Sequence, residues 1–120
     1  MAHEALLRCS TSVPGPVVEV WRRSTENDEV ALVTLDLVGE VCRETVGVIR
    51  NAALAAVPDS THRLVLDLRH VTFLDAGGLS LFVELDQRCQ QGHRRLELVR
   101  PPCSVARLLE IARLDELIKR

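Results

Sequence analysis

The sequence predicts an α/β fold in which a small mixed β-sheet of four to five strands has helices packed against it. Short β-branched or apolar runs alternate with longer stretches whose apolar residues recur at helical spacing. The resulting order is strand, strand, helix, strand, helix, strand, helix, and its strand-helix-strand steps require parallel neighbours joined by right-handed crossovers. A chain of 120 residues, 47% of them hydrophobic, suits one core.

The N-terminal part divides into an arm and a hairpin. Residues 1–16 mix polar residues with a final Pro-Gly-Pro, which predicts a loosely ordered arm without a secondary-structure element. Residues 17–21 and 30–38 are rich in β-branched and apolar residues and predict two strands joined by a long polar turn. We therefore expect a single domain over residues 17–120.

The apolar spacing changes after these strands. Residues 43–56 carry apolar side chains at helical intervals and predict an amphipathic helix that Pro58 ends. The apolar run at residues 64–68 has the length and β-branched content of a buried strand, although its periodicity alone does not exclude a helix.

Asp75 marks the start of the next helix. Its carboxylate can accept from free backbone N–H groups of the following turn, so residues 76–91 are predicted to be helical. Gly92 follows as a residue able to take a positive φ, and residues 96–99 predict a strand. Beyond two prolines, Ser104 is expected to cap a last helix.

The faces of the helix at 76–91 allow two interpretations. Its predicted core face is formed by Leu79, Phe82, Val83 and Cys89. The two remaining leucines, at positions 81 and 85, fit either an exposed docking patch or ordinary core packing.

Composition argues against several function classes. The formal net charge of −2 and the three aromatic residues give no basis for binding nucleic acid. No apolar stretch reaches the length of a membrane span, which argues against direct membrane insertion. Four cysteines without a CxxC pair, in a chain whose first residues lack a signal-peptide pattern, predict reduced thiols and a cytoplasmic location.

Catalysis, cofactors and metal binding are not predicted either. The spacing of the histidines and cysteines provides only Cys89 and His93 as a neighbouring pair, without a third ligand nearby in sequence. Nothing in the sequence pairs a nucleophile with an oriented base, so we expect no enzyme activity. A phosphate cradle at Gly77 and Gly78 is less favoured than close packing of the helix start against a loop or partner, because no phosphate-binding motif surrounds them.

Residues 64–85 resemble the signature of the STAS domain family, in which a strand leads into a D-L-x-x-V-x-F-x-D-S-x-G-L pattern. Residues 37–40 are similar to the family's turn before the first helix, and residues 105–117 to its final helix. The signature is matched at Asp67, Leu68, Val71, Phe73, Asp75, Gly78 and Leu79.

The resemblance implies an anti-sigma-factor antagonist of bacterial signalling, which regulates transcription by binding an anti-sigma factor. That partner is a histidine-kinase-like serine kinase, which phosphorylates a serine in the first turn of the helix. Here Ala76 and Gly77 occupy the family's two serine positions, so the usual phosphoacceptor is missing. Ser80 is a weak alternative acceptor because it lies one turn further on.

The resemblance therefore predicts a protein-binding regulator that lacks the serine switch. Alternatives are a STAS accessory subunit of an ABC-type lipid or anion transport system and a small-ligand-sensing module, and a homodimer stays open. The residues expected to contact the partner are Asp75, Ala76, Gly77, Gly78, Leu79 and Ser80, with Gly39 and Glu40 in an adjoining loop.

Overall fold

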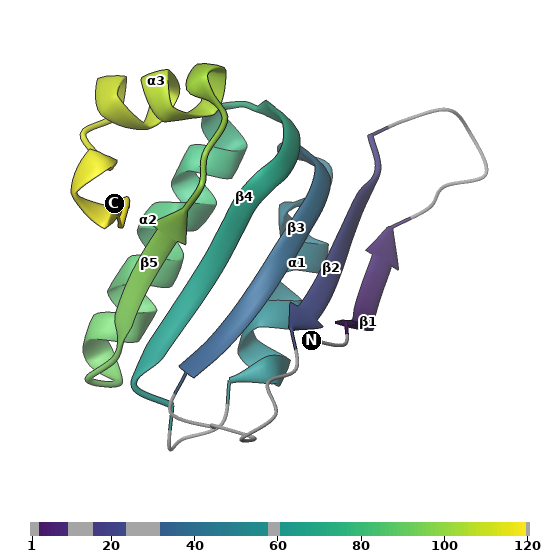
Figure 1. Cartoon of the computed structure of the whole chain (residues 1–120), viewed down its shortest axis with the longest axis vertical. Helices are drawn as coiled ribbons and strands as arrows, with labels where there is room; N and C mark the ends of the chain where they lie inside the picture. Colours follow the sequence, from purple (N-terminus) through teal and green to yellow (C-terminus); the bar gives the residue numbers. More distant parts are fainter. Residues whose placement is uncertain (1–2, 10–15, 24–31, 58–60, 120) are drawn as a thin grey trace.

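The structure is a computed structural model that describes residues 3–9, 16–23, 32–57 and 61–119. Its five-stranded sheet has the order β1-β2-β3-β4-β5. The strands are β1 (His3–Cys9), β2 (Val18–Arg23), β3 (Leu32–Val41), β4 (Arg63–Leu74) and β5 (Arg95–Val99). β1 to β3 pair antiparallel, whereas β3, β4 and β5 run parallel (Figure 1). The predicted mixed α/β sheet is confirmed.

Helices α1 (Val46–Ala56) and α2 (Ala76–Gln91) lie behind one face of the sheet (Figure 1). α3 (Cys103–Ile111) crosses the end of β4 and leads to a short 3-10 helix, η1 (Asp115–Leu117). Each parallel strand pair is thus joined by a helix, as the crossover rule requires. None of the helices in the described ranges is long and apolar enough to span a membrane.

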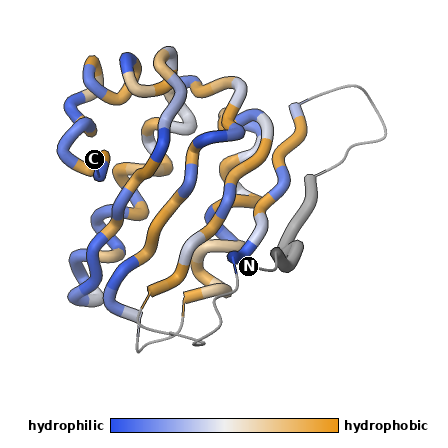
Figure 2. The backbone as a smooth tube through the Cα atoms, viewed as in Figure 1, coloured by the Kyte–Doolittle hydropathy of each residue, from blue (hydrophilic) through white to orange (hydrophobic). Residues whose placement is uncertain are grey.

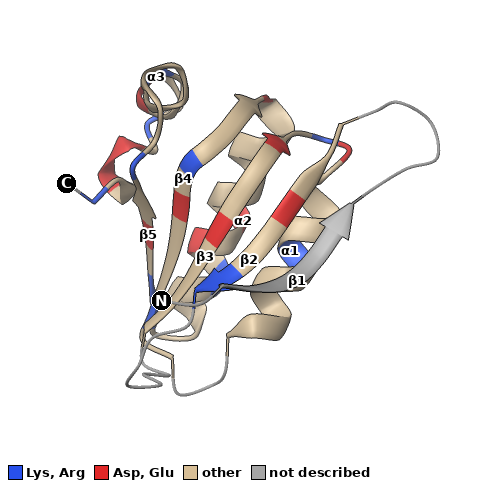
Figure 3. Ribbon diagram, turned by 45° about the vertical axis from the view of Figure 1, so that its right-hand side comes forward, with Lys and Arg blue, Asp and Glu red and all other residues tan. Residues whose placement is uncertain are grey.

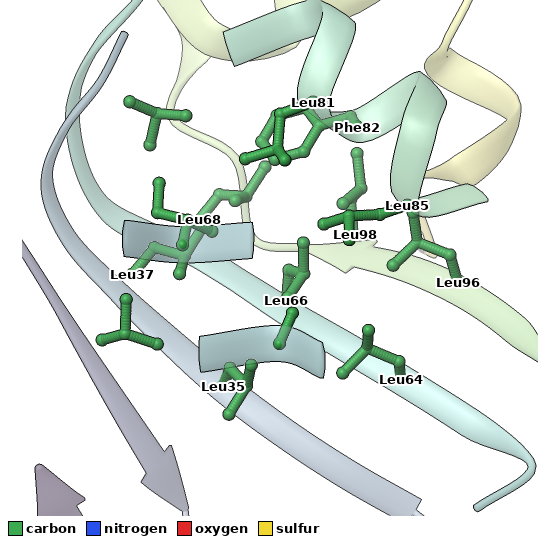
Figure 4. Close-up of a cluster of buried hydrophobic side chains, with 14 of the residues drawn as sticks. Leu35, Leu37, Leu64, Leu66, Leu68, Leu81, Phe82, Leu85, Leu96 and Leu98 are labelled. Carbon is green, nitrogen blue, oxygen red and sulfur yellow. The ribbon is translucent and has the colours of Figure 1, made fainter. Parts of the chain in front are cut away.

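The hydrophobic core fills the space between the sheet and helices α1 and α2. Apolar residues follow β3 and β4 and the helix faces behind them (Figure 2). Acidic and basic positions also occur on several strands of the sheet (Figure 3). Figure 4 shows the strand leucines pointing toward Leu81, Phe82 and Leu85 of α2. Because Leu81 and Leu85 are buried, the core interpretation of these two leucines is confirmed.

The outer side of α2 differs from the prediction. Val83, expected in the core, is 40% exposed. A helix advances about 100° per residue, so burial of Leu81, Phe82 and Leu85 turns position 83 away from the sheet. The predicted bounds of α2, residues 76–91, are confirmed.

The N-terminal prediction was wrong for part of the arm. His3–Cys9 form β1, which pairs antiparallel with β2. The hydrogen bonds of an edge strand come from its neighbour, so local composition did not reveal this strand. Residues 10–15 lie outside the described ranges, as does the polar turn between β2 and β3.

Two helix ends also required correction. Gly92 has a φ of −92°, and the left-handed conformation falls on His93, with a φ of 57°. The N–H of Arg94 then bonds back to the carbonyl of Cys89 at 2.7 Å, closing a Schellman-type end. At α3, Pro102 is the N-cap and Ser104 lies inside the helix, so Ser104 is not the cap.

Candidate partner-docking site

Asp75 joins the ends of two parallel strands to the start of α2. Val41 and Leu74 are neighbours at the ends of β3 and β4, and the Asp75 N–H donates to the Val41 carbonyl at 3.3 Å. The Asp75 carboxylate accepts from the N–H of Gly78 at 3.0 Å, which confirms the predicted N-cap. Its second oxygen accepts from the N–H of Arg43 at 3.3 Å. One side chain therefore fixes both the helix start and the turn before α1.

The two glycines of the helix start pack against backbone from the neighbouring strand and turn. A Cβ at Gly77 would lie 2.9 Å from the Cα of Arg43, and one at Gly78 would lie 2.6 Å from the carbonyl oxygen of Val41. Both distances are too short for a side chain in this backbone position. The predicted close approach to a loop is confirmed, because glycine lets α2 begin directly against the β3–α1 connection.

The predicted contact residues separate into exposed and buried positions. Ala76 and Ser80 are exposed, whereas Gly77 and Leu79 are half-buried. Gly78 is buried beneath Val41 and Leu74, so its assignment to the docking surface was wrong. The reason is helical geometry: the third residue of α2 faces the strand from which the helix turns away.

Gly39 and Glu40 lie inside β3, which corrects the prediction of a loop. Gly39 has a φ of +118°, and a Cβ there would collide with the carbonyl oxygen of Val17. The Glu40 N–H donates to that same oxygen at 2.9 Å, and the Glu40 carboxylate accepts from the Val17 N–H at 3.2 Å. Glu40 is thus bound to the start of β2.

Two exposed apolar side chains adjoin this region and were absent from the predicted contact set. Phe73 is 48% exposed and stands opposite Glu40 in the β3–β4 register, while Val17 is 41% exposed. Phe73 belonged to the recognised signature, and strand alternation could have placed it opposite the core face of Leu74. We use the name helix-start surface for the four exposed residues Val17, Phe73, Ala76 and Ser80.

Two observations on the described residues concern their chemistry: the state of the buried thiols and the grouping of possible metal ligands. Burial raises the pKa of the Cys42 and Cys89 thiols, which keeps both in the protonated, weakly nucleophilic form. Within the described ranges, no three His, Cys, Asp or Glu side chains converge as a metal site would require.

A protein-family model described as "Mlab, STAS domain" matches residues 24–119, most of the chain. The chain belongs to the STAS domain family. The signature at residues 64–85 is thereby assigned correctly, and its strand and helix are β4 and α2. No curated protein sequence matches the chain.

Several solved structures share this fold at low sequence identity. An anti-sigma factor antagonist from Mycobacterium paratuberculosis is 21% identical, with a TM-score of 0.70 over 84% of this chain and 82% of its own. The anti-sigma factor antagonist SpoIIAA in its unphosphorylated form is 18% identical, with a TM-score of 0.67 over 76% and 80%. The murine anion transporter Slc26a9 is 17% identical, with a TM-score of 0.63 over 68% of this chain and 14% of its own.

Proposed function

We propose that this STAS domain is a non-catalytic, cytoplasmic regulator of bacterial signalling that binds an anti-sigma factor or a related serine kinase. The observation that supports this most is the capped start of α2. Asp75 caps it, Ala76 and Ser80 are exposed on it, and the exposed Phe73 lies two residues before the cap. Small exposed residues permit close approach of a partner, and an exposed aromatic ring offers it apolar area to bury.

The proposed regulator works without the family's serine switch. Ala76 and Gly77 carry no hydroxyl, and a side chain at position 77 would press on the backbone of Arg43. Ser80 is exposed but lies one turn into α2, away from the free N–H groups that could receive a phosphate. Control would then come from the state of the partner.

Ala76→Arg tests the docking surface, with Ala55→Arg as a matched control. Both alanines are exposed helix residues, Ala76 at the start of α2 and Ala55 near the end of α1. Affinity purification with mass spectrometry should recover a histidine-kinase-like protein with the wild type and with Ala55→Arg. Ala76→Arg should weaken this binding about tenfold or more, because a bulky charge would be buried in the contact.

Equal recovery by both variants, with unchanged melting temperatures, would exclude the helix start from the contact. Incubation of the wild type with the recovered kinase and ATP should leave its intact mass unchanged. A stoichiometric phosphate would overturn the switch-free proposal and, if mapped to Ser80, would make that residue the acceptor.

A second candidate is an accessory STAS subunit of an ABC-type lipid or anion transport system. The match to the Mlab-type family model and the likeness to a domain-sized part of Slc26a9 favour it. The same purification separates the candidates, because recovery of an ATPase subunit in place of a small kinase would support transport. The helix-start surface would serve as the contact in either case.

A further inference from the structure

A row of four residues crosses the sheet face that α1 and α2 leave open. Trp21 on β2 stands opposite Asp36 on β3, Asp36 opposite Asp67 on β4, and Asp67 opposite Val99 on β5. Figure 3 shows acidic positions on neighbouring strands of the sheet. Asp36 and Asp67 are only 8% and 3% exposed. Two buried like charges side by side are destabilising unless cations compensate them.

Arginines from distant parts of the chain supply that compensation. Arg23 bonds both carboxylates, at 2.7 Å to Asp67, and the Arg100 guanidinium also bonds Asp67. The Arg69 backbone N–H donates to Asp67 at 3.0 Å. The Arg69 guanidinium has no ion pair in the part of the chain that the structure describes. At this end of the row, three arginines therefore lie close to two carboxylates.

The backbone is irregular at the same place. Between the pairs Asp36–Asp67 and Val38–His70, β4 advances three residues where β3 advances two, which is a β-bulge. Bulges re-aim side chains and are frequent beside functional sites. Arg100 adopts a left-handed backbone with a φ of 53°, a costly conformation for a residue other than glycine. Both features turn arginine side chains onto this face.

These side chains surround two adjoining hollows that share Asp36 and His70. The larger has a volume of about 540 Å³ and is lined by Arg23, Asp36, Asp67, Arg69, His70, Val99 and Arg100. The smaller measures 280 Å³ and is lined by Trp21, Asp36, Val38 and His70. One end of the combined groove is cationic and the other is aromatic and apolar.

We propose that this groove binds a small organic anion whose acid group pairs with the guanidiniums of Arg69 and Arg100 and whose flat apolar part lies against Trp21 and Val38. The guanidiniums recognise the planar oxygens of a carboxylate or the oxygens of a phosphate. Asp67 holds Arg100 in place, while the Trp21 indole N–H is bound to Glu19 at 3.1 Å. The groove is separate from the helix-start surface, so this proposal does not depend on the docking proposal.

Charge and size favour this occupant over a protein segment. The guanidiniums of Arg69 and Arg100 in the groove lining select an anion. Trp21 and Val99 are three strand spacings of about 4.8 Å apart, which is roughly 14 Å. A molecule with a ring at one end and an acid group at the other can cover such a distance.

Trp21 reports on the site directly, because the chain has one tryptophan and no tyrosine. We would titrate the full chain with 4-phenylbutyrate, 4-phenylbutyl phosphate and the neutral 4-phenylbutanol, following Trp21 emission. The two acids should change the emission saturably, and the alcohol should bind about tenfold more weakly, the factor expected for a charged hydrogen bond. Comparison of the two acids distinguishes a carboxylate from a phosphate preference.

Arg69→Gln removes a cation from the groove. Arg107→Gln is the matched control, because Arg107 is exposed on α3 and does not line the groove. Only Arg69→Gln should weaken binding of the acids, by about threefold to tenfold, at unchanged melting temperature. Equal binding of acid and alcohol, no effect of Arg69→Gln, or no saturable emission change with either acid would overturn the proposal. Emission that varies instead with protein concentration, together with dimers in sedimentation, would identify this face as an interface between copies and also overturn it.

Discussion

Asp67 shows how one residue can link distant segments of a fold. Burial raises the pKa of this carboxyl, but hydrogen bonds from Arg100, Arg23 and the Arg69 backbone outweigh burial and hold the pKa below its usual value. A carboxylate of this kind stabilises the fold while it is charged. Its neighbours in sequence, Leu66 and Leu68, are core residues. Asp67 points to the opposite face of β4, and the arginines that it binds there come from distant segments.

The lowered pKa of Asp67 predicts acid sensitivity. The stabilisation is complete above the unfolded pKa, about 4, and is lost as the pH falls through the lower folded value. Urea unfolding at a series of pH values from neutral to about pH 3 should show this loss as a fall in the free energy of unfolding. Asp67→Asn should cost about 3 kcal/mol at neutral pH, because Arg23 and Arg100 lose a charged partner.

Asp67→Asn should also flatten the fall in stability at low pH, whereas Asp115→Asn serves as the control for removing an exposed carboxylate. A slope in Asp67→Asn equal to that of the wild type would show that other carboxylates carry the acid response. Glu84 and Glu97 are the candidates, since hydrogen bonds from Arg50 and Arg63 respectively lower their pKa values.

At the scale of elements, the start of α2 depends on contact with the β3–α1 connection. The N-cap bond of Asp75 is local and could be predicted from sequence. The need for glycine at positions 77 and 78 comes from another segment, since Val41 and Arg43 occupy the space that side chains would fill.

A pair of glycine substitutions tests this difference. Gly78→Ala should lower the free energy of unfolding by about 1–3 kcal/mol, because its methyl group would meet the Val41 carbonyl and Leu74. Gly47→Ala should raise it by about 0.5–1 kcal/mol, because Gly47 lies in α1 with open space around it and alanine favours a helix. Chemical denaturation of both variants measures the contrast. Equal effects would mean that the close approach at Gly78 relaxes at little cost.

At the scale of the whole molecule, the C-terminal segment covers the free edge of β5. Ile118 forms a parallel bridge with Leu98, and the Lys119 N–H donates to the Leu98 carbonyl at 2.9 Å. Leu114, Leu117 and Ile118 also pack against the core. Because exposed strand edges promote association, covering this edge removes a site at which another strand could pair.

Removal of residues 115–120 should therefore lower the free energy of unfolding by about 2–3 kcal/mol, from the lost apolar burial. It should also produce concentration-dependent association through β5. Thermal denaturation and sedimentation velocity measure the two effects. Lys119→Ala is the control, since the half-exposed Lys119 ammonium lies 3.7 Å from the buried Glu97 carboxylate, which Arg63 still pairs, and its removal should cost less than about 1 kcal/mol. A truncated chain as stable as the full one would show that the edge needs no cover.

Across the molecule, local patterns were predicted and non-local pairings were not. The bounds of α2 and the cap at Asp75 depend on residues within one turn of each other, so the sequence carried their signal. β1 escaped prediction because its partner β2 lies beyond an intervening stretch of chain. The burial of Gly78 and the position of Gly39 inside β3 also arise from neighbouring strands.

The sequence alone determined the order of the helices and strands from β2 to α3, the STAS signature and the absence of a hydroxyl at positions 76 and 77. Periodicity, capping and side-chain chemistry are properties of short segments, so they can be read without coordinates. Only the tertiary structure decided which side of the helix start is exposed and that Arg23, Asp67 and Arg100 meet on the open sheet face. Strand pairing and register bring those residues together, and both are set by contacts between segments far apart in the chain.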